Sequence, residues 1–174
     1  LLTCLSSFGQ TFFIALFADD IQSVFELSHG GWGSMYTVGT TASAIVMVWA
    51  GRQADVFRVR TLGVLSLLAL ALACIAMSLN PWLWALPFVI FALRLTGQGM
   101  MSHIAAVAMA RWFVATRGRA LSISALGFSI GQAFLPIAVV ALMAFLDWRV
   151  IWLLCAGISL LGIPILMMLL SKER

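Results

Sequence analysis

Long stretches without charge constrain the fold of this 174-residue chain more than any other sequence feature. A helix that crosses a bilayer needs about 20 mainly apolar residues. Only 9% of the residues are charged and 63% are hydrophobic, whereas roughly 25% of a soluble domain is charged. This composition excludes a soluble enzyme and a disordered tail, and it indicates a polytopic membrane protein. The long uncharged stretches are 1–18, 27–51, 61–93, 95–110, 120–146 and 150–171.

These runs predict an all-α bundle of six transmembrane helices in one domain, 1–174. Pro81 divides the longest apolar run, because proline lacks a backbone donor and favours the first turn of a helix. Connections should be short, since unpaired backbone groups cost several kcal/mol in hydrocarbon, and only 19–31 is longer. The predicted spans are 1–18, 32–51, 61–79, 82–110, 119–146 and 149–170.

The charges between the spans predict the orientation. Short loops rich in Lys and Arg mark the cytoplasmic side of a membrane protein. Arg149 is the single positive residue on the other side, which also holds four acidic residues. We therefore expect both termini in the cytoplasm, an integral protein of a bacterial inner (plasma) membrane, and no nucleic-acid partner despite the net charge of +4. The eight positive residues predicted on the cytoplasmic side are Arg52, Arg58, Arg60, Arg111, Arg117, Arg119, Lys172 and Arg174.

Arg94 is the residue least expected inside a membrane. It lies 12 residues into the fourth predicted span, roughly 18 Å deep at 1.5 Å per residue. A central arginine costs on the order of 2.5–3.5 kcal/mol on insertion scales, so it must face a wet cavity or a partner. No predicted span contains Asp or Glu to pair with it. We interpret Arg94 as the contact for an anionic solute, and structural ion pairing is the less favoured alternative.

Three glutamines lie at comparable depth. Gln98 follows Arg94 at i+4 on the same helix face, and Gln10 and Gln132 lie in the middle of the first and fifth spans. Such amides either line a solute site or act as interhelical hydrogen bonds, which are often worth only about 0.6 kcal/mol. Phe13, at i+3 from Gln10, would add an apolar wall. The predicted substrate-binding residues are Arg94, Gln98, Gln10, Gln132 and Phe13.

The fifth span carries a stripe of small residues. Ala120, Ser124, Gly127 and Gly131 fall within an arc of about 60° at 100° per residue. Small residues let membrane helices approach closely, so Ser124, Gly127 and Gly131 are predicted packing positions. Gln132 points about 140° away from Gly127, so a second face could line a cavity.

The same span contains Gly127-Phe128-Ser129-Ile130-Gly131, which matches the G-x-S-x-G pattern of nucleophilic serines. That pattern has its mechanical meaning at a strand–turn–helix corner, whereas here it lies in an apolar helix. We leave an intramembrane serine hydrolase with His103 as base as a remote alternative. Apart from that alternative, we interpret His103 either as a hydrogen-bonded packing residue or as a proton carrier. No zinc-type cluster, P-loop or dinucleotide fingerprint is present, so we expect no enzyme activity, cofactor or metal.

The loop after the second span reads Gly51-Arg52-Gln53-Ala54-Asp55-Val56-Phe57-Arg58-Val59-Arg60. It resembles the G-x-x-x-D-R-x-G-R-R loop between spans two and three of the major facilitator superfamily. Gly51, Asp55 and Arg60 match, and a basic residue after Asp55 is missing. The stretches 94–99, 111–121 and 147–149 are similar to the same half of that family, and more narrowly to monocarboxylate and oxalate–formate type members.

The resemblance implies a six-helix N-terminal bundle, followed by a cytoplasmic loop and a second six-helix bundle. We therefore expect half a transporter, whose partner is either a missing C-terminal half or a second copy in a homodimeric carrier or channel. It implies secondary active transport of a small solute, such as a monocarboxylate, by alternating access. Asp55 would meet the opposite bundle and hold the outward-open state, supported by Arg60, and Gly51, Asp55 and Arg60 together form the expected gating loop. A proton carrier for symport would lie in the absent half or be His103.

Overall fold

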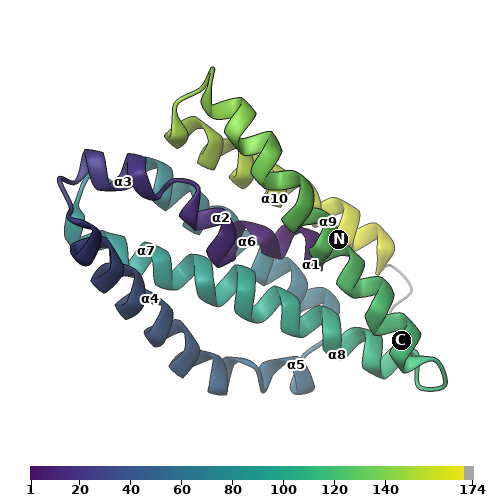
Figure 1. Ribbon diagram of the computed structural model, residues 1–174. Coiled ribbons are helices and arrows are strands. Elements are labelled where there is room, and N and C mark those ends of the chain that lie inside the picture. Colours follow the sequence, from purple (N-terminus) through teal and green to yellow (C-terminus); the bar gives the residue numbers. More distant parts are fainter. Residues whose placement is uncertain (171–174) are drawn as a thin grey trace.

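The computed structural model describes residues 1–170, and in that range every regular element is helical. The axes of the long helices lie roughly parallel across the view, and α6 and α10 lie behind the nearer helices (Figure 1). Four helical stretches among these residues are long and apolar enough to cross a membrane, and they match the predicted third to sixth spans. They are α6 (Val59–Leu79), the run Leu83–Trp112, α9 (Arg117–Met143) and α10 (Trp148–Leu169).

The second predicted span, 32–51, corresponds to α4 (His29–Ala50). Its 22 residues are long enough to cross a bilayer, but α4 is not among the four stretches that are also apolar enough. Gly, Ser and Thr make up much of its sequence. After α4 the chain makes one short helix, α5 (Gln53–Val56), before α6 begins.

The prediction of one helix over 1–18 is wrong. This segment divides into α1 (Leu2–Leu5), the 3₁₀ turn η1 (Ser6–Gly9) and α2 (Thr11–Ala15), and the backbone at Gln10 is extended, with φ −82° and ψ 154°. The prediction of a loop over 19–31 also needs correction, because α3 (Ala18–Val24) carries Asp19 and Asp20 in its first turn. The low helix propensity of serine and glycine around the break favours this interruption.

The fourth span is continuous in space but not uniform. A short 3₁₀ turn, η2 (Leu83–Ala85), leads into α7 (Leu86–Leu93), where Pro87 occupies the first turn. The chain then widens into π-helical turns over η3 (Arg94–Met101) and returns to α-helix in α8 (Ser102–Trp112). Turns of π-helix are rare in proteins as a whole, and those that do occur are often found at functional sites.

The most regular part of the fold is the pair of α6 and α10. A Cβ placed on Gly63 would lie 2.7 Å from Leu166 Cδ2, so these helices are in close contact. The Arg149 guanidinium donates to the carbonyl oxygens of Ser78 (2.6 Å) and Asn80 (3.1 Å) at the end of α6. A cation at a helix C-terminus pairs its otherwise unpaired carbonyls and complements its dipole. Arg149 therefore ties the start of α10 to the end of α6.

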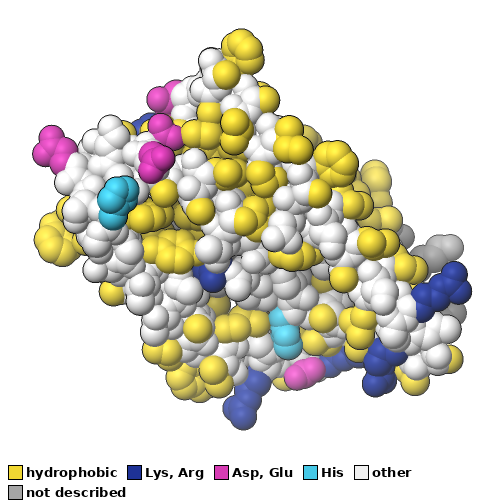
Figure 2. All heavy atoms as spheres, in the orientation of Figure 1, with side chains coloured by type: hydrophobic (Ala, Val, Ile, Leu, Met, Phe, Trp, Pro, Cys, Tyr) yellow, Lys and Arg dark blue, Asp and Glu magenta, His cyan; other side chains and the backbone are white. Residues whose placement is uncertain are grey.

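Charged and apolar side chains occupy different zones of the surface. In Figure 2 most acidic side chains gather near α3, and most basic ones lie at the opposite end, near α5 and the turn between α8 and α9. Apolar side chains cover much of the surface between these two zones in Figure 2. Large apolar side chains exposed on the molecule include Leu72, Phe88 and Phe134. This separation fits an integral membrane protein. Lys172 and Arg174, part of the predicted basic side, lie outside the described residues.

Candidate functional site

The two irregular segments, η1 and η3, cross in direct backbone contact. A Cβ placed on Gly97 would lie 2.7 Å from Gly9 Cα. A Cβ on Gly9 would lie 2.8 Å from Gly97 Cα and would overlap the carbonyl oxygen of Leu93. Backbone atoms cannot move aside as a side chain can, so this crossing requires glycine on both segments. The crossing brings the break at Gln10 next to the π-helical turns that begin at Arg94.

Arg94 is buried at this crossing, with 8% of its surface exposed. Its Nη1 donates to Thr11 Oγ1 at 2.9 Å and to the Gly9 carbonyl oxygen at 3.4 Å. The guanidinium carbon lies 5.8 Å from the centre of the Tyr36 ring, within the range of a cation–π contact. Within residues 1–170 these partners are neutral, and Arg94 Nε has no hydrogen-bond partner.

Thr11 and Tyr36 are site residues that the sequence reasoning missed. The Tyr36 hydroxyl donates to Thr11 Oγ1 at 3.0 Å, so Thr11 joins Tyr36 on α4 to Arg94 on η3. A signal was available for Tyr36, since it is the only tyrosine in the chain and lies in a predicted span. Thr11 had no distinguishing pattern, because threonine is common in apolar helices.

Further polar groups at the crossing have no partner. Gln98 Oε1 and Ser7 Oγ are buried and make no hydrogen bond among the described residues. Gln10 is half-buried at the break itself. With Arg94 Nε, three buried polar atoms on the two crossing segments therefore have no partner within residues 1–170. Most buried polar atoms in proteins are paired, so this is where an external polar ligand would form the most new hydrogen bonds.

The structure brings together only part of the predicted substrate set. Arg94, Gln98 and Gln10 lie on or beside the crossing segments. Gln132 lies on an exposed face of α9. Phe13 is fully buried, and its ring centre lies 5.4 Å from that of Trp152. In this conformation Phe13 is a packing residue of the core and presents no surface to a solute.

The small residues of α9 face the broken first segment. A Cβ placed on Gly127 would overlap the hydroxyl of Thr3, and one on Gly131 would overlap the hydroxyl of Ser7. Ser124 lines a cavity of about 290 Å³ together with Thr3 and neighbouring apolar residues. The α9 helix therefore packs along α1 and η1 through its glycines.

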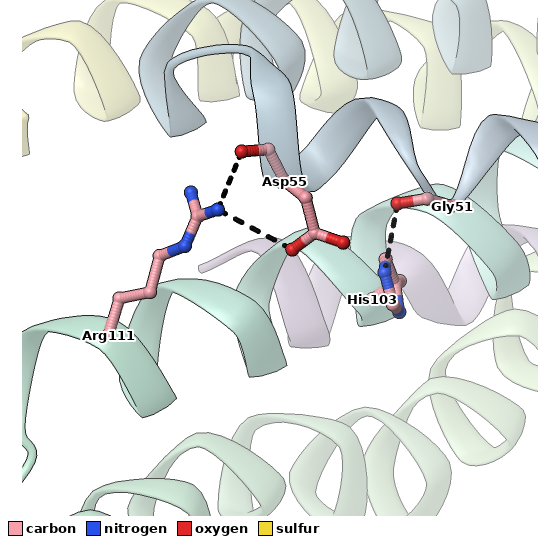
Figure 3. Close-up of polar contacts among 4 residues, drawn as sticks. All are labelled: Gly51, Asp55, His103 and Arg111. Carbon is pink, nitrogen blue, oxygen red and sulfur yellow. Dashed lines mark hydrogen bonds and ion pairs between the residues drawn. The ribbon is translucent and has the colours of Figure 1, made fainter.

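A second polar group lies at the basic end of the bundle (Figure 3). Arg111 Nη2 donates to the Asp55 carbonyl oxygen at 2.8 Å and to Asp55 Oδ1 at 3.4 Å. His103 Nε2 lies 3.1 Å from the carbonyl oxygen of Gly51, where α4 ends. Arg111 is a partner of Asp55 that the loop pattern did not indicate. Because both side chains are largely exposed, this ion pair is worth about 1 kcal/mol or less.

The structure does not join Ser129 to His103. Ser129 Oγ donates to the carbonyl oxygen of Ala125 within α9, whereas His103 contacts Gly51. A nucleophilic serine needs a base within hydrogen-bond reach, and His103 does not fill this role for Ser129 in this conformation. In residues 1–170, no group of three His, Cys, Asp or Glu side chains is arranged to hold a metal ion.

Comparison with known proteins gives one match. The family model described as Major Facilitator Superfamily matches residues 1–174. No curated protein and no solved structure matches the sequence.

Proposed function

The chain belongs to the Major Facilitator Superfamily, and on this premise we propose that it is the N-terminal six-helix half of a secondary transporter that moves a small organic anion by alternating access. Members of this family are transporters and not enzymes. The proposed substrate class is a small carboxylate, such as a monocarboxylate, in keeping with the resemblance to monocarboxylate and oxalate–formate type members.

The observation that carries this proposal is the buried guanidinium of Arg94 with only neutral partners. A carboxylate would accept charge-assisted hydrogen bonds from it, and such bonds are roughly twice as strong as neutral ones. The guanidinium is positioned by Thr11 and Gly9, and among residues 1–170 its Nε has no hydrogen-bond partner. Discontinuous helices near the bilayer midplane are a recurring way to build solute sites in transporters.

The neighbouring amides would complete the site. Gln98 has an unpaired Oε1 beside Arg94, which could accept from a hydroxyl or a protonated carboxyl of the solute. Gln10 lies at the break in the first segment. Gln132, exposed on α9, would contact the solute only from the side that a second bundle covers.

A second bundle is the proposed partner. The α9 helix is the least buried of the four long apolar helices, and exposed apolar residues line it. Either a C-terminal half of the same protein or a second copy of this chain would cover such a face. Crosslinking of the purified full-length protein separates the two, since only the second yields a covalent dimer. The exposed apolar residues of α9 include Ile123, Leu126, Ile130, Phe134 and Ile137.

The basic end would hold the gate. We propose that Gly51, Asp55 and Arg60 control the contact with the opposite bundle, with Arg111 holding Asp55 in this conformation. His103, whose Nε2 lies 3.1 Å from the carbonyl oxygen of Gly51, is the proposed proton site for symport.

Uptake of a small carboxylate into liposomes by the full-length protein tests the proposal. Arg94→Gln should reduce uptake about 100-fold, equivalent to about 2.7 kcal/mol, because it removes the charge that binds the anion. Arg94→Lys should retain part of the uptake, since it keeps the charge but loses the planar fork. Arg52→Gln, exposed at the basic end, is the matched control. Uptake with unchanged KM and rate in Arg94→Gln would remove Arg94 from the site.

A further inference from the structure

Two of the three cysteines lie inside the contact between α6 and α10. Cys74 is fully buried and Cys155 has only 4% of its surface exposed, and both thiols are free in this structure. Neither the solute site nor the gate uses them. The helices that carry them are joined at both ends, by the contact of Gly63 with Leu166 and by the bonds of Arg149 to the end of α6.

The register of the two helices places these cysteines opposite each other. The start of α6 contacts the end of α10, so the helices are antiparallel. A Cβ placed on Gly162 would lie 3.6 Å from Leu67 Cδ2, so Leu67 and Gly162 are facing positions. Seven residues make close to two helical turns and return to the same face. Counting seven residues forward from Leu67 gives Cys74, and counting seven backward from Gly162 gives Cys155.

Both cysteines also belong to the buried stripes along which α6 and α10 meet. Buried residues recur on each helix at alternating intervals of four and three, which is the spacing of interlocking helix pairs. Glycines in both stripes let the backbones approach closely, and a disulfide needs Cα atoms within about 7 Å. The stripes are Gly63, Leu67, Leu70, Cys74 and Met77 on α6, and Trp152, Cys155, Ser159, Gly162 and Leu166 on α10.

The surroundings of the two thiols restrict which reagents can reach them. Neither stripe contains a charged residue, and buried structural cysteines are inert toward reagents that act from water. A charged oxidant would have to lose its hydration to reach the contact. A neutral oxidant that dissolves in hydrocarbon has no such barrier. It would meet Cys155 first, because Cys74 has no exposed surface.

We propose that Cys74 and Cys155 form a dithiol site, which neutral, hydrocarbon-soluble two-electron oxidants such as azodicarboxamides and quinones convert into a disulfide between α6 and α10. Two S–H bonds break and one S–S bond forms. The oxidant takes up both electrons and both protons, as a hydrazine or a hydroquinone. Reactants and products are neutral, so the reaction leaves no ion in the apolar interior. The site does not depend on any solute at Arg94.

Peptide mapping by mass spectrometry of the full-length protein in liposomes tests this site. A neutral azodicarboxamide should join the peptide that holds Cys74 to the peptide that holds Cys155, and a reductant should release them. Ferricyanide, a charged oxidant, should leave both thiols unreacted over the same time. A cross-link between distant residues restricts mainly the unfolded chain, so oxidation should raise the melting temperature by about 5 °C.

The third cysteine supplies the matched control. Cys4 lies on α1, and its backbone faces Gly127 and Gly131 of α9, so it is a thiol of the same chain outside the α6–α10 contact. Cys4→Ala should keep the cross-link and the rise in melting temperature. Cys155→Ala should lose both.

Absence of the cross-link in the folded wild type after treatment with the azodicarboxamide would overturn the proposal. So would pairing of Cys74 or Cys155 with Cys4 or with a second chain, because facing thiols should react with each other first. Equal reaction with ferricyanide would also overturn it, since the thiols would then be reached from water. These three outcomes are read from the wild type and do not depend on whether a variant folds.

Discussion

The α6–α10 pair and the η1–η3 crossing belong to the same apolar bundle, but the backbone is continuous helix in the pair and interrupted at the crossing. The pair consists of continuous helices of 21 and 22 residues, and a buried hydroxyl such as that of Ser159 is paired within its own helix, with the Cys155 carbonyl. At the crossing, the chain is extended at Gln10 and π-helical after Leu93. Arg94, Gln98 and Ser7 each have a polar atom there with no hydrogen-bond partner in the described part of the chain.

The difference indicates which part of an apolar bundle can form a polar binding site. Irregular backbone and unpaired polar groups are costly in hydrocarbon and are tolerated where protein or a polar cavity surrounds them. The regular pair supplies the rigid support, and Trp152 on α10 packs against Phe13 and Phe17 of the broken segment. The bundle therefore separates a scaffold of complete helices from a candidate site of interrupted ones.

A glycine series should produce the largest effect and tests this separation directly. Gly9→Ala should lower the free energy of unfolding by about 2–3 kcal/mol, the upper part of the usual range for overpacking, because its Cβ would meet backbone of η3. Gly63→Ala should cost less, since its Cβ meets only the flexible end of Leu166. Thermal melting of the detergent-solubilised full-length protein would rank the variants.

Gly157→Ala in α10 is the matched control. A Cβ there would meet nothing within 4 Å, and replacing glycine by alanine in a helix interior stabilises by roughly 0.5–1 kcal/mol. Its melting temperature should therefore rise slightly. If Gly9→Ala melted no lower than Gly63→Ala, the backbone contact between η1 and η3 would not be the rigid crossing described above.

The sequence predicted the regular helices well. The expected spans 61–79 and 149–170 agree with α6 (Val59–Leu79) and α10 (Trp148–Leu169) within two residues at each end. A long apolar run that is bounded by charged residues strongly favours a membrane-spanning helix.

The interruptions could not be predicted in this way. Hydropathy does not distinguish an α-turn from a π-turn, and Gln10 differs little from other residues of its run. The partner of Arg94 depends on tertiary contact, since Thr11 is 83 residues away in sequence. The same holds for Asp55 and Arg111, which are 56 residues apart. Phe13 was assigned to the site by helical periodicity, which fails once the helix breaks at Gln10.

A threonine comparison gives the next effect in size. Thr11→Val keeps the shape of the side chain but removes the hydroxyl that contacts Arg94 and Tyr36. The loss of hydrogen bonds to a charged group should weaken carboxylate uptake about ten-fold, or about 1.4 kcal/mol. Tyr36→Phe should have a smaller effect, because Arg94 keeps its contact with Thr11. Uptake by the full-length protein in liposomes measures both.

Thr37→Val is the matched control for this comparison. Thr37 follows Tyr36 on α4 and is exposed, so its hydroxyl is accessible without contact to the crossing. Its replacement should leave KM unchanged. Equal losses in Thr11→Val and Thr37→Val would mean that hydroxyls in this region act through general stability and that Thr11 does not position Arg94.

The smallest effect should come from the acidic residues near α3, where the charge of Asp147 at the start of α10 acts on Asp20. Burial raises the pKa of Asp20 above its ordinary value of 3.8, and the charges of Asp147 and Asp19 raise it further. The folded protein thus keeps a proton that the unfolded chain has lost, so stability falls as pH rises from 3.8 through the raised pKa. Near neutral pH, Asp20→Asn should therefore raise the free energy of unfolding by less than about 0.5 kcal/mol, because the group is screened by solvent. Its melting temperature should be slightly higher than that of the wild type.

The difference should shrink below pH 3.8, where both side chains are neutral. A difference that stays the same at both pH values would show that shape, and not repulsion between α3 and α10, sets the effect.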